Sequence, residues 1–398
     1  MSLKISKLDG MLYKYLYWII LSTFLLSMFS NIERVLINGA IILVIDIQLI
    51  KSNGFNLKKN EISQAAFIIY CIFSFVVFIS NGYPIYIFLS SFVGSVLPII
   101  LMFCRNIELY EEYFENTYKA LVVSFVISLL LHILTPSFYC NYLYNKGYIN
   151  INNTFWAKYF FQGIFGVTAL GTLSACASLF FLCKFIDNKR TSTLLLMGLS
   201  MLSLFVTRRR SAIAAFLLGT VFIILFTNIQ SNTKRSRKMY FLGIVIILML
   251  IIIIVRNLDY FINVINLVTD ISGAINERNE GWYKNIRSLG FFDLFFGTGL
   301  GSRSHTAFQY GYMAVTDSSY IQLFCELGIV GISLLILMIL NFVINIRLKD
   351  VNYSYLSAVL VVFVYLIQAV GSNVFEFQAT APLFWISMGY CIHYKSRR

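Results

Sequence analysis

Long uninterrupted apolar runs alternate with short polar segments along almost the whole chain. About 20 apolar residues in a helix are enough to cross the hydrocarbon core of a bilayer. The runs are continuous rather than alternating, which argues against a β-barrel. We therefore expect an all-α polytopic membrane protein with a single transmembrane domain over residues 1–398. Twelve spanning helices are predicted, at about 12–30, 34–50, 62–81, 84–104, 117–135, 159–186, 191–207, 211–229, 239–255, 319–346, 353–372 and 377–394.

Composition supports this class. Hydrophobic residues make up 59% of the chain and charged residues 12%, and the mean hydropathy is +0.77, whereas soluble domains are about half apolar and a quarter charged. The net charge of +13 is spread over many short loops, so it is not interpreted as nucleic-acid binding. The seven cysteines form no C-x-x-C pair, and we expect neither a disulfide framework nor a zinc site.

The distribution of basic residues predicts the orientation. Most Lys and Arg residues fall in the segments that face inward if both termini are cytoplasmic. The positive-inside rule therefore predicts a protein of the cell (inner) membrane with both termini in the cytoplasm. The first apolar run lacks a small-residue cleavage motif and is interpreted as a spanning helix. Residues 256–318 become one large extracytoplasmic loop between helices nine and ten.

This large loop combines short amphipathic pieces with a glycine cluster. Apolar residues recur at helical spacing over residues 257–271, which predicts a helix lying on the membrane or capping a cavity. The turn from Gly297 to Gly301 is not a dinucleotide fingerprint, because no βαβ unit surrounds it. Glycines there indicate close approach to a ligand or to another backbone.

Three consecutive arginines, Arg208, Arg209 and Arg210, fall in a short turn on the predicted outer side. They oppose the positive-inside rule. One interpretation is that they extend to lipid phosphates. The other is that they bind an anionic ligand, since the forked guanidinium donors fit phosphate.

Two carboxylates lie at the entry to the tenth predicted helix. Asp317 precedes Tyr320, and Glu326 falls within the membrane. A carboxylate inside a membrane indicates either a functional group or a structural partner for a nearby arginine or polar backbone. Both interpretations remain open for Glu326.

Residues 317–331 (DSSYIQLFCELGIVG) resemble the end of the outer loop in the O-antigen polymerase and O-antigen ligase superfamily. Residues 297–301 are similar to that family's G-x-G turn, and residues 278–282 to its R-x-x-x-W segment. Residues 207–212 are similar to its T-x-S-R-[GS]-A turn, with Arg209 where serine is usual. The pieces occur in the family's order and on the expected face of a twelve-helix layout.

The resemblance implies an inverting, metal-independent membrane glycosyltransferase with a polyprenyl-pyrophosphate-linked sugar donor at the outer leaflet. It assigns Arg210 and Arg278 to the pyrophosphate and Asp317 to the place of the ligase histidine, the base. His305 is the alternative base. Ligases carry His-Asn where this chain has Asp317-Ser318, which favours a polymerase. No cofactor and no catalytic metal are expected.

The sequence thus predicts a polymerase that joins lipid-linked repeat units of a surface polysaccharide, O antigen or capsule. The expected partners are that glycan, the bilayer, and a chain-length regulator and flippase of the same pathway; nucleic acid is not expected. An O-antigen ligase remains the alternative, as does a flippase or transporter, although the only deep charged residues are Asp46 and Glu326, with Glu376 at the edge of the last span. The expected catalytic residues are Asp317, Arg210, Arg278 and His305, and the expected substrate-binding residues are Arg208, Arg209, Trp282, Gly299, Gly301, Tyr320 and Glu326.

Overall fold

The computed structural model describes residues 61–103, 107–145, 163, 166–230, 280–315, 317–346, 352–376 and 381–394. All regular elements in these ranges are helices, and none is a strand. Nine of the twelve predicted spans fall on described residues, and each is helical there. The spans predicted at 12–30, 34–50 and 239–255, and the amphipathic segment 257–271, lie outside the described residues.

Within each described range, neighbouring helices follow one another with short connections. Five of them are long and apolar enough to cross a membrane, starting at Ile62, Ile85, Glu111, Val167 and Ser319, so the structure is that of a polytopic helical membrane protein. The exact number of spans and the large outer loop stay predictions. The elements are α3 (Ile62–Ser80), α4 (Ile85–Ser91), η2 (Phe92–Val96), η3 (Leu97–Phe103), α5 (Ile107–Leu134), α6 (Pro136–Asn145), α8 (Val167–Asn188), α9 (Thr191–Thr207), α10 (Arg210–Gln230), a helix at 280–287, α14 (Phe291–Phe296), α15 (His305–Gln309), α16 (Ser319–Asn345), α17 (Tyr353–Gln368) and α18 (Ala381–His393).

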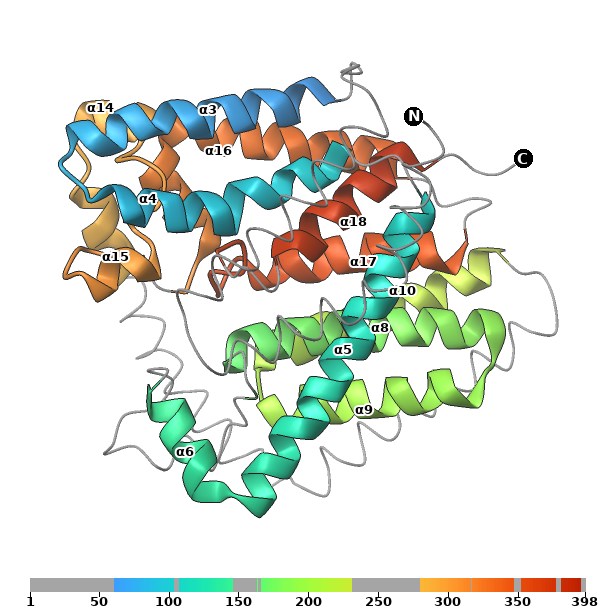
Figure 1. Ribbon diagram of the computed structural model, residues 1–398. Helices are drawn as coiled ribbons and strands as arrows, with labels where there is room; N and C mark the ends of the chain where they lie inside the picture. The colour runs from blue at the N-terminus through green and yellow to red at the C-terminus, as the bar shows by residue number, and fades with distance from the viewer. Residues whose placement is uncertain are drawn as a thin grey trace, which may run out of the picture.

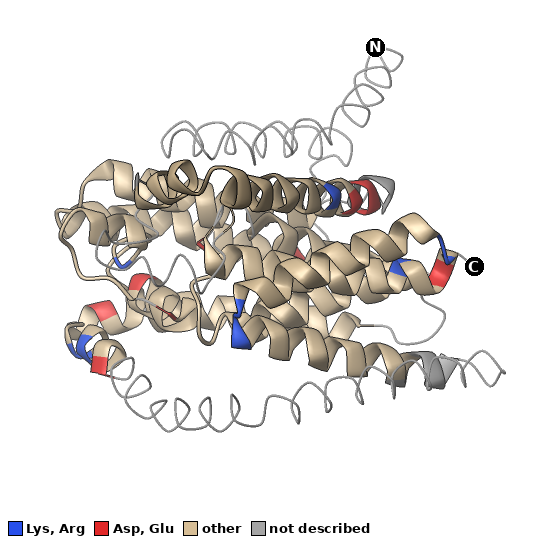
Figure 2. Ribbon diagram, turned by 90° about the horizontal axis from the view of Figure 1, so that it is seen from below, with Lys and Arg blue, Asp and Glu red and all other residues tan. Residues whose placement is uncertain are grey.

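The helices run up and down through one bundle, so their connections gather at two ends. The α3–α4 and α9–α10 turns, α14, α15 and the end of α17 lie toward one end, on the left in Figure 1, and the α8–α9 turn lies at the other. Charged positions also concentrate toward the ends of the helices, whose middle stretches are largely uncharged (Figure 2). The arginine turn and the segment from residue 280 to Asp317 therefore share one end of the bundle. Whether that end faces outward stays a prediction.

Helix α8 forms the centre of the second half of the bundle. Of its apolar window, 89% is buried, whereas 33% of the windows of α3 and α16 is buried. Serine pairs join α8 to α9, with Oγ–Oγ distances of 2.7 Å for Ser174–Ser203 and 3.2 Å for Ser178–Ser200. Small residues and interhelical hydrogen bonds hold helices together where lipid removes the hydrophobic driving force. This seam fixes α9 up to the arginine turn.

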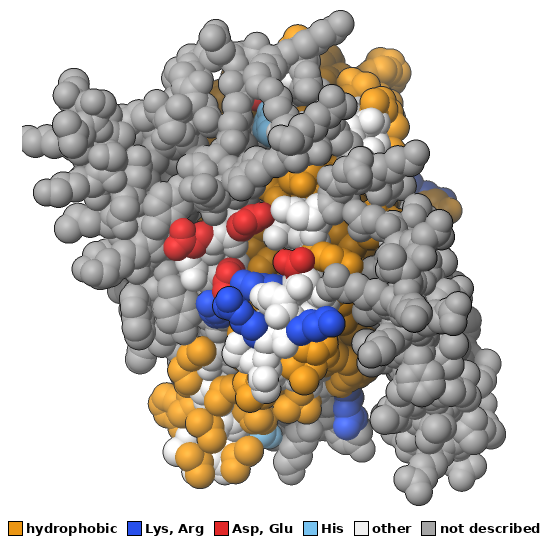
Figure 3. All heavy atoms as spheres, turned by 90° about the vertical axis from the view of Figure 1, so that its right-hand side faces the viewer, with side chains coloured by type: hydrophobic (Ala, Val, Ile, Leu, Met, Phe, Trp, Pro, Cys, Tyr) orange, Lys and Arg blue, Asp and Glu red, His pale blue; other side chains and the backbone are white. Residues whose placement is uncertain are grey.

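The opposite end of the bundle carries charges of both signs, which face the viewer in Figure 3. Glu115 of α5 accepts from Lys119 at 2.7 Å and pairs with Lys184 near the end of α8. His393 lies 3.2 Å from the buried Glu61. These contacts link α5, α8, α18 and the start of α3 away from the arginine turn.

The helical geometry of α16, which begins at Ser319, is interrupted at Gly328. Gly328 has φ 64° and ψ −167°, outside the helical region. Such a break interrupts the ladder of backbone hydrogen bonds, and buried carbonyls then need other partners. These partners come from the glycine turn at residues 297–301 and from α3: Thr298 N donates to Cys325 O (3.0 Å), Gly299 N to Glu326 O (2.9 Å), and Tyr70 Oη to Leu327 O (2.9 Å).

Glycines make this contact sterically possible. An ideal Cβ at Gly297 would lie 2.1 Å from the Glu326 carbonyl oxygen, and one at Gly299 would lie 2.5 Å from Phe78 Cα. Gly301 meets the Ser91 hydroxyl in the same way, at 2.5 Å. The close approach expected for this turn is therefore to the backbone of the broken helix and to α3 and α4.

We expect Gly297→Ala to destabilise the protein far more than Gly82→Ala. Both glycines have positive φ, 79° and 74°, but a Cβ at Gly82 meets nothing within 4 Å. A strained backbone costs about 1–3 kcal/mol, and the steric clash adds to that cost only at Gly297. Melting temperatures in detergent test this expectation. Equal losses for the two variants would contradict the packing described here.

Candidate active site

The arginine turn separates α9 from α10. Arg208 ends α9 in a left-handed conformation (φ 53°), and Arg210 begins α10; both are exposed. Arg209 is half-buried: its Nη2 donates to the Thr168 hydroxyl of α8, and its stem packs on Gly171, where a Cβ would lie 3.1 Å from Arg209 Cβ. Arg209 thus anchors the turn to α8, while Arg208 and Arg210 present their side chains at the exposed end of the bundle.

The arginine turn is hydrogen-bonded to the end of α17. Ser211 Oγ, next to Arg210, donates to Gln368 Oε1 at 3.0 Å. The following residue, Ala369, accepts from the backbone of Ser319, at 3.0 Å. Adjacent residues of one segment therefore contact both the arginine turn and the first turn of α16.

Asp317 occupies the sharp entry into α16. Its φ of 66° lies in the left-handed region, and Ser318 after it caps the helix by accepting from Ile321 N at 3.4 Å. Ser318 N donates to Asn373 Oδ1 at 2.8 Å, and Asn373 Nδ2 donates to Val315 O at 2.6 Å. The Asn373 amide thus holds the chain on both sides of Asp317.

His305 begins the short helix α15. Its backbone N donates to Glu376 Oε1 at 2.9 Å. Although its side chain has an exposed surface, loss of hydration lowers the pKa of His305, and the charge of Asp317 acts in the opposite direction. The two predicted candidates for the base are thus near enough to influence each other, and the imidazole is favoured in its neutral form.

Glu326 is buried inside the wall of this region, with 1% of its surface exposed. Its Oε1 accepts from Gln322 Nε2 at 3.0 Å and from Arg303 N at 3.2 Å. Arg303 is itself buried, and its Nη2 donates to Ser288 Oγ at 3.0 Å. These contacts favour the structural interpretation of Glu326 over direct contact with a substrate.

The two aromatic candidates also have structural contacts. Tyr320 Oη donates to Leu366 O of α17 at 3.0 Å. Trp282 is half-buried and packs against a small apolar cluster of Leu289, Val315 and Cys325. Tyr320 therefore joins α16 to α17, and Trp282 joins the helix at 280–287 to α16.

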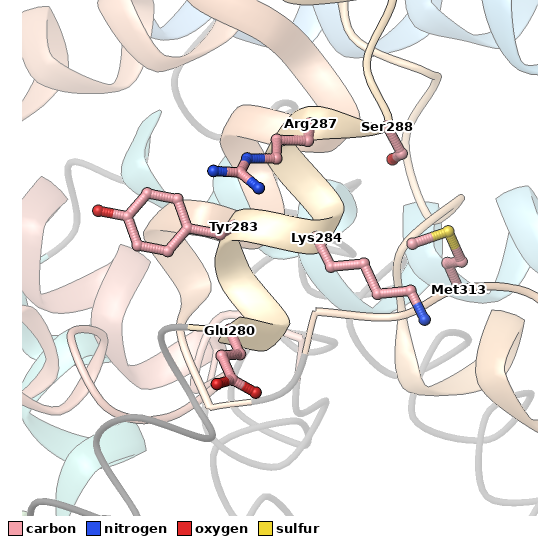
Figure 4. Close-up of a pocket in the computed structure, with 6 residues that line it drawn as sticks. All are labelled: Glu280, Tyr283, Lys284, Arg287, Ser288 and Met313. Atoms are coloured by element: carbon pink, nitrogen blue, oxygen red, sulfur yellow. The ribbon is translucent and has the colours of Figure 1, made fainter.

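An open pocket of about 560 Å³ lies over the helix at 280–287. In Figure 4, Lys284 and Arg287 extend from this helix, and Tyr283 points to the same side as Arg287. The Arg287 guanidinium lies 5.8 Å from the centre of the Tyr283 ring. The pocket thus combines two cations with an exposed aromatic ring. Its lining residues are Glu280, Tyr283, Lys284, Arg287, Ser288 and Met313.

Parts of the predicted site are linked through residues 368–376. Ser211 next to Arg210, Ser318 next to Asp317, and the backbone of His305 each hydrogen-bond to this segment. Gly299 and Gly301 are buried against α3 and α4. Arg278 lies outside the described residues. Sequence reasoning missed Gln368 and Asn373, because single polar residues at the end of an apolar run form no motif. It also missed Arg303, which follows the glycine turn within a polar stretch.

A family model described as O-antigen ligase matches residues 193–336. The match covers the arginine turn, the pocket, the glycine turn and the entry into α16. It confirms the resemblance to the O-antigen polymerase and ligase superfamily. No curated protein matches the chain. Together with the apolar helices, the match indicates a membrane enzyme of the glycosyltransferase type.

The partial burial of Glu376 predicts a pH-dependent stability. Burial raises the pKa of Glu376 to about 7, so the folded protein holds this proton more tightly than the unfolded chain does. The resulting stability is fully present below the ordinary carboxyl pKa of 4.5 and is lost as the pH rises through about 7. We expect Glu376→Gln to remove this part of the dependence. Melting temperatures across this range, compared with those of Glu280→Gln as an exposed control, test it; identical curves for Glu376→Gln and wild type would contradict it.

Proposed function

We propose that this protein is a polymerase that joins polyprenyl-pyrophosphate-linked oligosaccharide repeat units of a bacterial surface polysaccharide at the outer face of the cytoplasmic membrane. One observation carries the proposal. Ser211 next to Arg210, Ser318 next to Asp317, and the backbone of His305 all hydrogen-bond to residues 368–376 at one end of an apolar bundle. A glycosyl transfer at the membrane surface requires a cation that stabilises the leaving group and a base that takes the proton of the acceptor hydroxyl. Both groups must lie at the same end of the bundle.

Arg210 and Arg278 would stabilise the pyrophosphate as it leaves. A departing pyrophosphate gains negative charge, and guanidinium groups neutralise this charge through paired hydrogen bonds. Arg209 is held against α8, which fixes the neighbouring Arg210. The open pocket supports the same function, since Lys284 and Arg287 suit an anionic part of the donor and Tyr283 suits a sugar face.

His305 and Asp317 would together remove the proton from the acceptor hydroxyl. A neutral imidazole accepts a proton near pH 7, and loss of hydration keeps His305 in this form. The negative charge of Asp317 would then stabilise the imidazolium that is formed, as the carboxylate does in serine hydrolases. This division of roles makes His305 the base and Asp317 its electrostatic partner.

The choice of a polymerase over a ligase rests on Asp317-Ser318, where the resemblance gives ligases His-Asn. Deletion of the gene separates the two activities. Loss of a polymerase leaves single repeat units on the carrier, whereas loss of a ligase leaves lipid-linked polymer. Accumulated polymer would overturn the polymerase assignment in favour of the ligase.

Purified protein supplied with lipid-linked repeat units already exposed to solvent should extend them. We expect Arg210→Ala, Asp317→Ala and His305→Ala each to lower the rate of chain growth by at least about a hundredfold, as loss of a charge-stabilising group or a base does. Lys189→Ala, at the opposite end of the bundle, serves as the control. Full activity of all three variants would exclude this site, and absence of any chain growth by wild type would favour a transporter.

The roles of His305 and Asp317 predict a specific pH effect. Asp317 raises the pKa of His305 against the larger effect of lost hydration. Asp317→Asn should therefore lower that pKa and move the acid limb of kcat/KM to lower pH, besides lowering kcat. The pH profile of the purified variant tests this, with Asp293→Asn as a matched control. An unmoved acid limb would exclude His305 as the base influenced by Asp317.

A further inference from the structure

The residues from Gln368 to Glu376, between α17 and α18, contact all three parts of the described candidate site. The three contacts use three different side chains and are all short. Each partner is a candidate residue or its neighbour in the chain. Gln368 Oε1 accepts from Ser211 Oγ (3.0 Å), Asn373 Oδ1 accepts from Ser318 N (2.8 Å), and Glu376 Oε1 accepts from His305 N (2.9 Å).

We propose that the 368–376 segment sets the relative position of Arg210, Asp317 and His305, with Asn373 and Glu376 as positioning residues. The proposal rests on the proposed function, because it concerns the same site. The family match ends at residue 336, so it assigns no role to this segment. Without the segment, the described candidates come from three separate elements: the α9–α10 turn, α15 and the start of α16.

The segment is rigid enough for this role. Gln368 is 1% exposed and Asn373 2% exposed. Ser319 donates to the Ser372 carbonyl from both its backbone N (3.2 Å) and its Oγ (3.0 Å). The Phe375 ring packs against Phe384 and Trp385 of α18 and Tyr320 of α16, with ring centres 4.8, 6.0 and 6.2 Å apart. Buried aromatic packing and paired hydrogen bonds restrict the conformational freedom of the segment.

The Asn373 side chain both accepts and donates a hydrogen bond here, as a side-chain amide can. It accepts from Ser318 N through Oδ1 and donates to Val315 O through Nδ2. An ionised aspartate has the same shape but only accepts, so it would place a negative charge against the Val315 carbonyl. Asn373→Asp thus breaks one contact without opening a cavity and adds no bulk near Asp317.

Glu376 allows a complementary pair of variants. Glutamine keeps the carbonyl oxygen that accepts from His305 N, whereas alanine removes it. If Glu376 acts by placing α15, Glu376→Gln restores what Glu376→Ala loses. If the negative charge itself were required, both variants would fail alike.

The experiment uses the full-length protein in nanodiscs and a lipid-linked repeat unit as the substrate. It measures kcat and KM for glycosyl transfer by the wild type and by each variant. We expect Asn373→Asp and Glu376→Ala to lower kcat by at least about tenfold with little change in KM, as misplaced reacting groups do. Glu376→Gln should stay within about threefold of wild type. Asn345→Asp is the matched control, since Asn345 bonds only within α16, to Asn341.

Rates are expressed per folded molecule, with the folded fraction taken from size-exclusion profiles and melting temperatures. The proposal is overturned if Asn373→Asp and Glu376→Ala keep the wild-type kcat. It is also overturned if their loss of rate disappears on correction for folding, or if Glu376→Gln is as impaired as Glu376→Ala. Failure of the proposed function has a different signature. It is indicated if Arg210→Ala and His305→Ala are as active as wild type, whatever the activity of the Asn373 and Glu376 variants.

Discussion

The broken hydrogen-bond ladder of α16 at Gly328 is the constraint on which the rest of the site depends. A membrane provides no water to the carbonyls of Cys325, Glu326 and Leu327, so protein donors must replace the missing helical ones. Two of these donors, the amides of Thr298 and Gly299, belong to the glycine turn at residues 297–301. The described residues around this turn are therefore tied directly to the backbone of α16. The glycine turn is hydrogen-bonded to the broken helix. His305 lies six residues after Gly299 in the chain and is therefore close to this anchored turn in sequence.

Polar groups below the site extend this anchoring into the bundle. Glu326, buried one residue before Leu327, accepts from the Arg303 backbone, and the Arg303 guanidinium donates to Ser288 at the edge of the pocket. Buried charges are costly unless they are hydrogen-bonded, and loss of one partner strands the other. The network thus connects the pocket to the helix break through hydrogen bonds, whose loss would leave buried polar groups without partners. This gives Glu326 a function in the site without contact with substrate.

The sequence predicted the helices well because each span has a strong local signal. The ends of α3, α9 and α16 fall within two residues of the expected ones, since an apolar run sets a helix whatever its neighbours are. The arginine turn, Asp317 and the glycine turn also carried a signal, as misplaced charges or as clustered glycines. Asn373 and Gln368 carried none, because their partners lie 55 and 157 residues away along the chain. Contacts between distant elements leave no periodic pattern in one sequence. The Arg278 prediction lies outside the described residues.

The residues proposed for the leaving group and those proposed for the base are held by different contacts. The leaving-group side depends on Arg210, whose turn is tied to α8 and to the end of α17. The base side depends on His305 and Asp317, which are tied to the glycine turn and to residues 369–376. Residues 368–376 hydrogen-bond to both sides. Glycosyl transfer needs the acceptor hydroxyl and the departing pyrophosphate aligned on one sugar carbon, and small displacements of either group are costly. A membrane enzyme with its reacting groups on separate helices therefore needs a connection that fixes those helices relative to one another, and the 368–376 segment has this role in our proposal.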